Sequence, residues 1–156
     1  MAIHFDIFPM ESTHTLKIAE LESICFGKNA WSKNSLDAEL TKDTSQFFTA
    51  LSENGEVLGY CGSYICIDEC YINNIAVFPE FQGSGIGKAL TQKLIQNAKN
   101  KNCVFITLEV RVSNQKAVSL YETLGFSTAG RRKNFYTSPV EDALIMTHYF
   151  KGYCPV

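Results

Sequence analysis

The chain has 156 residues and a mass of 17.5 kDa, a size that one domain with one hydrophobic core fills. Hydrophobic residues make up 46% of the sequence and aromatic residues 12%, which excludes an intrinsically disordered chain. The 14 basic and 16 acidic residues give a formal net charge of -2, so no basic excess supports nucleic-acid binding. We therefore expect a single folded domain over residues 1–156 that does not bind nucleic acid directly.

The cysteines and the amino-terminal segment favour a protein of the reducing cytoplasm. The cysteines lack the CxxC spacing of zinc or redox sites, and residues 1–17 lack the basic start and apolar core of a signal peptide. Cys66 and Cys70 have apolar neighbours and no histidine beside them, so we expect buried thiols rather than metal ligands. No apolar run approaches the roughly 20 residues of a membrane-spanning helix, so we expect no membrane contact.

The first part of the chain predicts one strand followed by two helices. Residues 3–8 alternate as a strand does, and apolar residues recur with helical spacing through 12–27. A loop at 27–31 leads to Ser32, whose hydroxyl suits an N-cap, and to a second helix at 35–41.

Three strands are expected next, at 47–52, 57–67 and 69–78, because these stretches are rich in β-branched and aromatic residues. Asn54 and Gly55, between the first two strands, form the strongest hairpin signal in the chain. We therefore expect antiparallel hairpins in this part of the sheet.

The second half predicts a long amphipathic helix at 85–100, a strand at 104–112, a helix at 114–124 and two strands at 126–131 and 143–150. The elements add up to about seven strands and about four helices. We expect an α/β (α+β) fold with a mixed, mostly antiparallel central sheet flanked by the helices.

The glycine-rich stretch at 82–87 is the most informative about function, because it joins a strand ending at 75–77 to the long helix. Glycines let the backbone approach a ligand, and the free N–H groups at a helix start favour an anion such as pyrophosphate. A tight turn without a ligand would also explain the glycines. A P-loop is disfavoured because Ala89 replaces the required hydroxyl. A dinucleotide site is disfavoured because it would follow the first strand of a βαβ unit, whereas this turn comes mid-chain after antiparallel hairpins.

The sequence resembles the Gcn5-related N-acetyltransferases (GNAT), whose acetyl-coenzyme A motif, Gln/Arg-x-x-Gly-x-Gly/Ala, is met by residues 82–87. Further stretches are similar to the RimI type of this family, the ribosomal-protein-alanine N-acetyltransferases. They lie at 108–111, at Asn114, at 120–126 and at 141–146.

The resemblance implies a single N-acetyltransferase domain with the GNAT fold and acetyl-CoA as co-substrate. It implies a gap between the strands around Ile75 and Leu108, in which the pantetheine arm pairs with one strand while helix-start N–H groups hold the pyrophosphate. The residues it assigns to acetyl-CoA are Ile75, Ala76, Val77, Gln82, Gly83, Ser84, Gly85, Ile86, Gly87 and Asn114.

Glu109 is the candidate general base. An α-amino group, with a pKa of about 7.7–8, is mostly protonated at neutral pH and must lose a proton before it attacks a thioester. Strand alternation puts Glu109 on the same face as Phe105 and Thr107, in an otherwise apolar strand, where burial would raise the pKa of its carboxyl. An ion pair with Arg111, or an exposed edge position, is the alternative explanation of the residue.

Tyr121 is the general acid that the RimI resemblance implies, because a phenol near the sulfur can protonate the departing thiolate. Helical phase alone places Tyr121 on the buried face with Ala117 and Leu124, where a core tyrosine is the alternative. The resemblance implies direct transfer without a covalent intermediate or a metal. Cys66 and Cys103 are poor nucleophile candidates because no histidine lies near them in the sequence.

Trp31 and Tyr136 are the candidate acceptor-binding residues. Trp31 would wall a peptide cleft or anchor its loop to the core. Residues 131–136 are expected in the connection to the last strand, where Tyr136 would contact the acceptor or be an exposed loop tyrosine. The basic run 131–133 fits a solvated turn, with an anion contact as the alternative.

We expect an acetyl-CoA-dependent enzyme that acetylates a protein α-amine, the N-terminal alanine of a small-subunit ribosomal protein. Acetylation of a lysine side chain or of a small-molecule amine is the nearest alternative, because this fold serves many acceptors. A non-catalytic coenzyme A sensor is the alternative from another class, and it leaves Glu109 and Tyr121 without a role.

Overall fold

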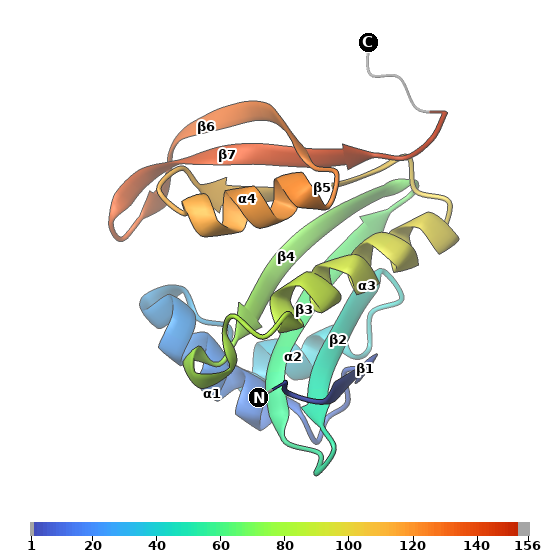
Figure 1. Ribbon diagram of the computed structural model, residues 1–156, viewed down its shortest axis with the longest axis vertical. Coiled ribbons are helices and arrows are strands. Elements are labelled where there is room, and N and C mark those ends of the chain that lie inside the picture. The colour runs from blue at the N-terminus through green and yellow to red at the C-terminus, as the bar shows by residue number, and fades with distance from the viewer. Residues whose placement is uncertain (1, 153–156) are drawn as a thin grey trace.

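Seven strands form one mixed sheet in the computed structural model, which describes residues 2–152 (Figure 1). Every neighbouring pair is antiparallel except β4 and β5, which run parallel. In order across the sheet the strands are β1 (Phe5–Pro9), β2 (Ser45–Ser52), β3 (Val57–Cys66), β4 (Glu69–Val77), β5 (Phe105–Arg111), β7 (Val140–Tyr149) and β6 (Ser127–Thr137).

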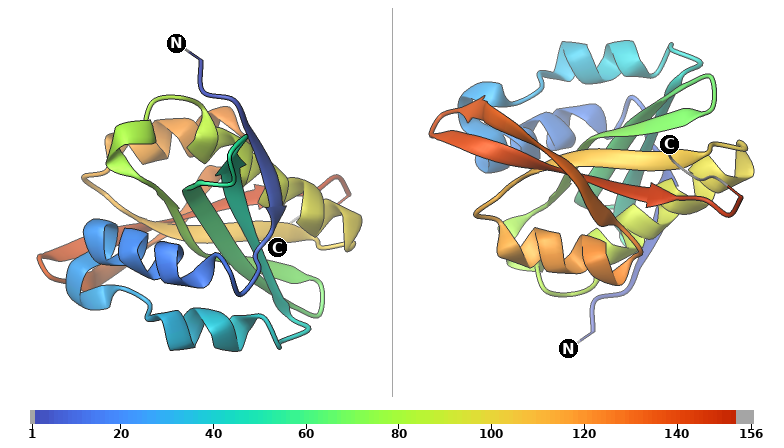
Figure 2. Two further views of the ribbon diagram at one scale, coloured as in Figure 1. Left: turned by 90° about the horizontal axis from the view of Figure 1, so that it is seen from below. Right: turned by 90° about the horizontal axis from the view of Figure 1, so that it is seen from above.

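Two helices cover each face of the sheet (Figure 2). One face carries α1 (Thr15–Phe26) and α2 (Lys33–Glu39), and the other carries α3 (Ile86–Asn100) and α4 (Gln115–Thr123). Short 3₁₀ turns, η1 (Gly27–Asn29) and η2 (Pro79–Phe81), precede α2 and α3. The expected mixed, mostly antiparallel sheet with four helices is confirmed.

The apolar stripes read from the sequence form two cores on opposite faces of the sheet. Leu90 and Leu94 of α3 are fully buried against β2, β3 and β4, and Ile18 and Leu21 of α1 are fully buried on the other face. The predicted cap of α2 is confirmed, because the Ser35 N–H donates to Ser32 Oγ over 3.1 Å.

The expected end of β6 at residue 131 is wrong, because the strand continues to Thr137 and β7 begins at Val140. Tyr136 therefore lies in a strand, paired with Glu141, and not in a loop. The polar run hid this strand from sequence analysis, since its two arginines find their partners on two other strands, β7 and β5. Arg131 donates through Nε to Asp142 Oδ2 over 2.7 Å, so the basic run is not a solvated turn.

The cysteines differ partly from expectation. Cys70 is buried as expected, but Cys66 is exposed because it ends β3 at the turn into β4. Cys154 lies outside the described residues. Within residues 2–152, no helix is long and apolar enough to cross a membrane, and no three His, Cys, Asp or Glu side chains gather as a metal site requires.

β4 and β5 separate along their length, and this split positions the functional site. They pair only where Glu69, Cys70 and Tyr71 face Phe105, Ile106 and Thr107, and Figure 1 shows the ribbons diverging from there. A β-bulge occurs close by in β4: Asn74 pairs with Gly62 and Ile72 with Ser63, which leaves Asn73 unpaired. The gap expected between the strands around Ile75 and Leu108 is therefore present.

Candidate active site

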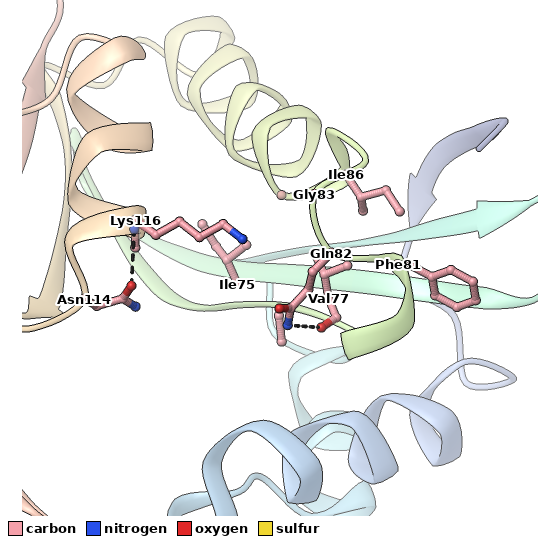
Figure 3. A pocket seen from close by; sticks show the side chains of 11 residues that line it. Ile75, Val77, Phe81, Gln82, Gly83, Ile86, Asn114 and Lys116 are labelled. Carbon is pink, nitrogen blue, oxygen red and sulfur yellow. Dashed lines mark hydrogen bonds between the residues drawn. The ribbon is translucent and has the colours of Figure 1, made fainter. Parts of the chain in front are cut away.

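One cleft of about 210 Å³ opens on the α3 and α4 side of the split (Figure 3). We call it the donor cleft. It includes every residue predicted to hold acetyl-CoA except Ser84 and Gly85. Its lining is Ile75, Ala76, Val77, Phe81, Gln82, Gly83, Ile86, Gly87, Asn114, Lys116 and Ala117.

The turn into α3 is built around two glycines in left-handed conformations. Gly83 has φ +79° and Gly85 has φ +88°, values that L side chains adopt only with strain. Gly85 is the N-cap of α3 and offers no side chain to the first helical turn, so its N–H groups are left for a ligand. Two side chains hold the turn in place: Ser84 Oγ donates to the Phe81 carbonyl, and Gln82 Nε2 donates to the Val77 carbonyl over 3.1 Å.

Asn114 and Lys116 bring α4 to the other wall of the donor cleft. Asn114 caps α4, because its Oδ1 accepts the Ala117 N–H over 3.2 Å. Figure 3 shows the Lys116 side chain extending from α4 across the cleft. Sequence analysis missed Phe81 and Ala117, which are partly buried against the core and so resemble ordinary core residues, and Lys116, which is exposed.

A second cleft, of about 550 Å³, lies where β4 leaves β5 on the other face of the sheet. We call it the acceptor cleft. It brings together the predicted Trp31 and Glu109, from segments far apart in sequence, but includes neither Tyr121 nor Tyr136. Its lining is Trp31, Tyr64, Tyr71, Ile72, Asn73, Phe105, Thr107, Glu109, Arg132, Ile145, Thr147 and Tyr149.

The two clefts meet on β4. Ile72 and Asn73 line the acceptor cleft, and Ile75, two residues further along, lines the donor cleft. Asn73 is the bulged residue, and its Oδ1 is buried with no hydrogen-bond partner. Sequence analysis missed Asn73, although two adjacent asparagines in an apolar strand are a detectable signal.

Glu109 faces the acceptor cleft with Phe105 and Thr107, as strand alternation predicted. The side chain is 33% exposed and not buried, because β4 has already left β5 at this point. Its carboxylate pairs with Arg132, at 3.3 Å between Oε1 and Nε. The alternative pairing with Arg111 is wrong, since Arg111 donates to Glu141 over 3.1 Å.

Tyr121 lies in α4 and Tyr136 in β6, and neither lines a cleft. Burial raises the pKa of Tyr121 to about 12, with a smaller contribution from Tyr136. Burial first, and then the negative charge of Glu109, raises the pKa of Tyr136. The Arg111 guanidinium lies 4.3 Å from the centre of the Tyr136 ring, so this tyrosine is packed in a strand and not exposed in a loop.

A model of the Acetyltransferase (GNAT) family matches residues 15–126. This range contains the whole donor cleft and the acceptor-cleft residues from Trp31 to Glu109. The chain belongs to the GNAT acetyltransferase family. It is accordingly an N-acetyltransferase, and this family uses acetyl-CoA.

Curated relatives and solved structures agree with this membership. The Escherichia coli K12 ribosomal protein bS18-alanine N-acetyltransferase is 41% identical over 98 residues, 62% of this GNAT chain and 66% of that protein. A Bacillus subtilis strain 168 protein, provisionally named as the same enzyme, is 38% identical over 129 residues, 83% of this chain and 85% of that protein.

Two crystal structures share the fold over nearly the whole chain. The Escherichia coli ribosomal-protein-S18-alanine N-acetyltransferase has a TM-score of 0.84 at 29% identity, covering 97% of this chain and 100% of that one. A GNAT acetyltransferase from Elizabethkingia anophelis, solved with acetyl-CoA bound, has a TM-score of 0.76 at 26% identity, covering 94% and 98%.

Proposed function

We propose that this GNAT enzyme transfers the acetyl group of acetyl-CoA to the α-amine of a protein amino terminus. The proposed acceptor is the N-terminal alanine of ribosomal protein bS18. The observation that carries the proposal is the meeting of two clefts at the β4 split, with Glu109 on the acceptor side. The names of the relatives supply the alanine acceptor. A ribosomal acceptor would place the reaction in the cytoplasm.

The donor cleft fits acetyl-CoA, which supplies the acetyl group as a thioester. Ile75, Ala76 and Val77 would hold the pantetheine arm, because β5 does not pair with β4 there. The pyrophosphate would take the N–H groups of the turn Gln82, Gly83, Ser84, Gly85, Ile86 and Gly87. Asn114 would bond the arm from α4, and Lys116 adds a positive charge at the same wall.

Glu109 would act as the general base. It pairs with Arg132 in a cleft large enough for a peptide end, so it would attract the acceptor ammonium and then accept its proton. Trp31 would contact the bound amino terminus of the acceptor from the side of the cleft formed by α1 and α2. Tyr136, within the field of the Glu109 charge, would contact the acceptor near the base.

Tyr121 would act as the general acid. Its pKa of about 12 keeps the phenol protonated at neutral pH, so a proton is available for the departing sulfur. Ala117, one helical turn before Tyr121 in α4, lines the donor cleft. Transfer would be direct, with no covalent intermediate and no metal.

The test is acetyl transfer to a hexapeptide that begins Ala-Arg, beside an amino-blocked copy with an internal lysine and a polyamine. We expect turnover on the free alanine peptide only, and a Glu109→Gln loss of about 10²–10⁴-fold with coenzyme A binding retained. Turnover only on the blocked lysine peptide or the polyamine would replace the acceptor. Coenzyme A binding without turnover on any amine would favour a sensor module.

A further inference from the structure

Glu22 is a carboxylate with no exposed surface, in the core between α1 and the sheet. A buried carboxylate is unfavourable unless hydrogen bonds satisfy it. Glu22 receives three: Oε1 accepts from the Tyr60 hydroxyl and from Asn74 Nδ2, the latter at 2.7 Å, and Oε2 accepts from the Trp31 N–H at 3.4 Å. The mechanism above gives this residue no role.

The three donors belong to three segments that build the two clefts. Tyr60 is in β3, Asn74 is in β4, and Trp31 is in the loop between η1 and α2. Asn74 lies between Asn73, which lines the acceptor cleft, and Ile75, which lines the donor cleft. Glu22 therefore joins the Trp31 wall of the acceptor cleft to the strand that both clefts share.

We propose that Glu22 is a positioning residue that fixes the Trp31 loop against β4 and so sets the shape of the acceptor cleft. This rests on the proposed function, in that the cleft is taken to receive the amine. The chemistry of the position requires a carboxylate, because Asn74 Nδ2 and the Trp31 N–H can only donate and Tyr60 donates in this network. Glutamine, which has the same size, has one acceptor oxygen and an NH₂ group, so it cannot accept at both positions.

Glu22→Gln tests the proposal with a change of little more than one atom. If the Gln oxygen keeps Tyr60 and Asn74, its NH₂ faces the Trp31 N–H, and two donors meet. The opposite orientation leaves Asn74 facing NH₂ and loses the shorter bond. The variant is therefore expected to release the Trp31 loop while Ile18 and Leu21, both fully buried, keep α1 in place.

Trp31 is the only tryptophan in the chain, so its fluorescence reports on the loop directly. We expect Glu22→Gln to raise acrylamide quenching of Trp31 about twofold or more, as its N–H contact is lost. Glu20→Gln is the matched control, because Glu20 is on the same helix, 57% exposed and paired with Lys17. Tyr60→Phe removes a sheet-side donor but leaves the Trp31 contact, so it should change thermal stability without changing the quenching.

Kinetics separate a positioning role from a structural one. We expect Glu22→Gln to raise KM for the acceptor peptide about tenfold, while KM for acetyl-CoA and the Kd of coenzyme A stay within about twofold. Equal losses for both substrates, or no change in either, would overturn the proposal.

The quenching result separates this inference from the proposed function. Unchanged quenching in Glu22→Gln would overturn the role of Glu22 for any acceptor. If the wild type acetylates no peptide but the quenching rises in Glu22→Gln only, the proposed acceptor fails and the positioning of the Trp31 loop stands.

Discussion

Arg132 Nε lies 3.3 Å from Glu109 Oε1, so the proposed base is paired with a guanidinium that reaches it from β6 across β7. Both side chains line the acceptor cleft, and they are 56% and 33% exposed. An exposed ion pair of this kind contributes only about 0.2–1 kcal/mol. An incoming ammonium group would compete with Arg132 for the same carboxylate.

Arg132→Gln should lower KM for the acceptor peptide, because it removes the competing cation. The weak pair limits the effect to about fivefold at low salt. Steady-state kinetics at two salt concentrations measure it, and the gain should shrink as salt rises. Arg131→Gln is the control, since Arg131 pairs with Asp142 and does not line the cleft. A higher KM in Arg132→Gln would mean that Arg132 binds the acceptor itself.

Tyr121→Phe should lower kcat about 10²–10⁴-fold and leave the Kd of coenzyme A unchanged, because only proton donation is removed. The pKa of about 12 also predicts the alkaline behaviour. A tyrosine at its ordinary pKa of 10.0 would lose its proton, and the enzyme its activity, around pH 10. With the raised pKa, the kcat of the wild type should stay constant as the pH passes 10. The pH profiles of the wild type and Tyr121→Phe should therefore run parallel in this range.

Gly85→Ala should weaken coenzyme A binding about tenfold. An added Cβ meets nothing within 4 Å, so the cost is the strain of φ +88° at the residue that starts α3, about 1–3 kcal/mol. Gly55→Ala is the matched control, because Gly55 has φ +80° and equal open space but lies in the β2–β3 turn. Calorimetry should find weaker binding in Gly85→Ala only, while both variants unfold at lower temperature. Equal coenzyme A binding in the two variants would contradict the proposal that the turn into α3 holds the pyrophosphate.

The elements of the fold were predictable from sequence wherever residues close together in the chain determine them. The α3 stripe, the Ser32 cap and the Asn54–Gly55 hairpin each depend on neighbours along the chain, and all three occur as predicted. The extension of β6 was not predictable, because Arg131 finds its partner in β7 and Arg132 finds its partner in β5.

The same distinction holds for the candidate site. The donor turn could be read from its glycines because it is a local structure. The partner of Glu109 could not, since Arg132 comes from two strands away and the nearer Arg111 is held by Glu141. The Glu22 network was invisible for the same reason, as its donors come from three separate segments.

Burial raises the pKa of Glu22 above its ordinary value of 4.5, and its three hydrogen bonds oppose this rise without cancelling it. The folded protein therefore binds a proton at Glu22 more readily than the unfolded chain does. This contribution to stability is fully present below pH 4.5 and is lost as pH rises through the raised pKa.

Glu22→Gln cannot titrate, so the free energy of unfolding of the wild type should fall relative to the variant as pH increases from 4.5. Urea unfolding of both proteins at a series of pH values measures this difference, from which all other carboxylates cancel. A difference that grows in favour of the wild type with pH would mean that the hydrogen bonds from Tyr60, Asn74 and Trp31 outweigh the cost of burying the charge.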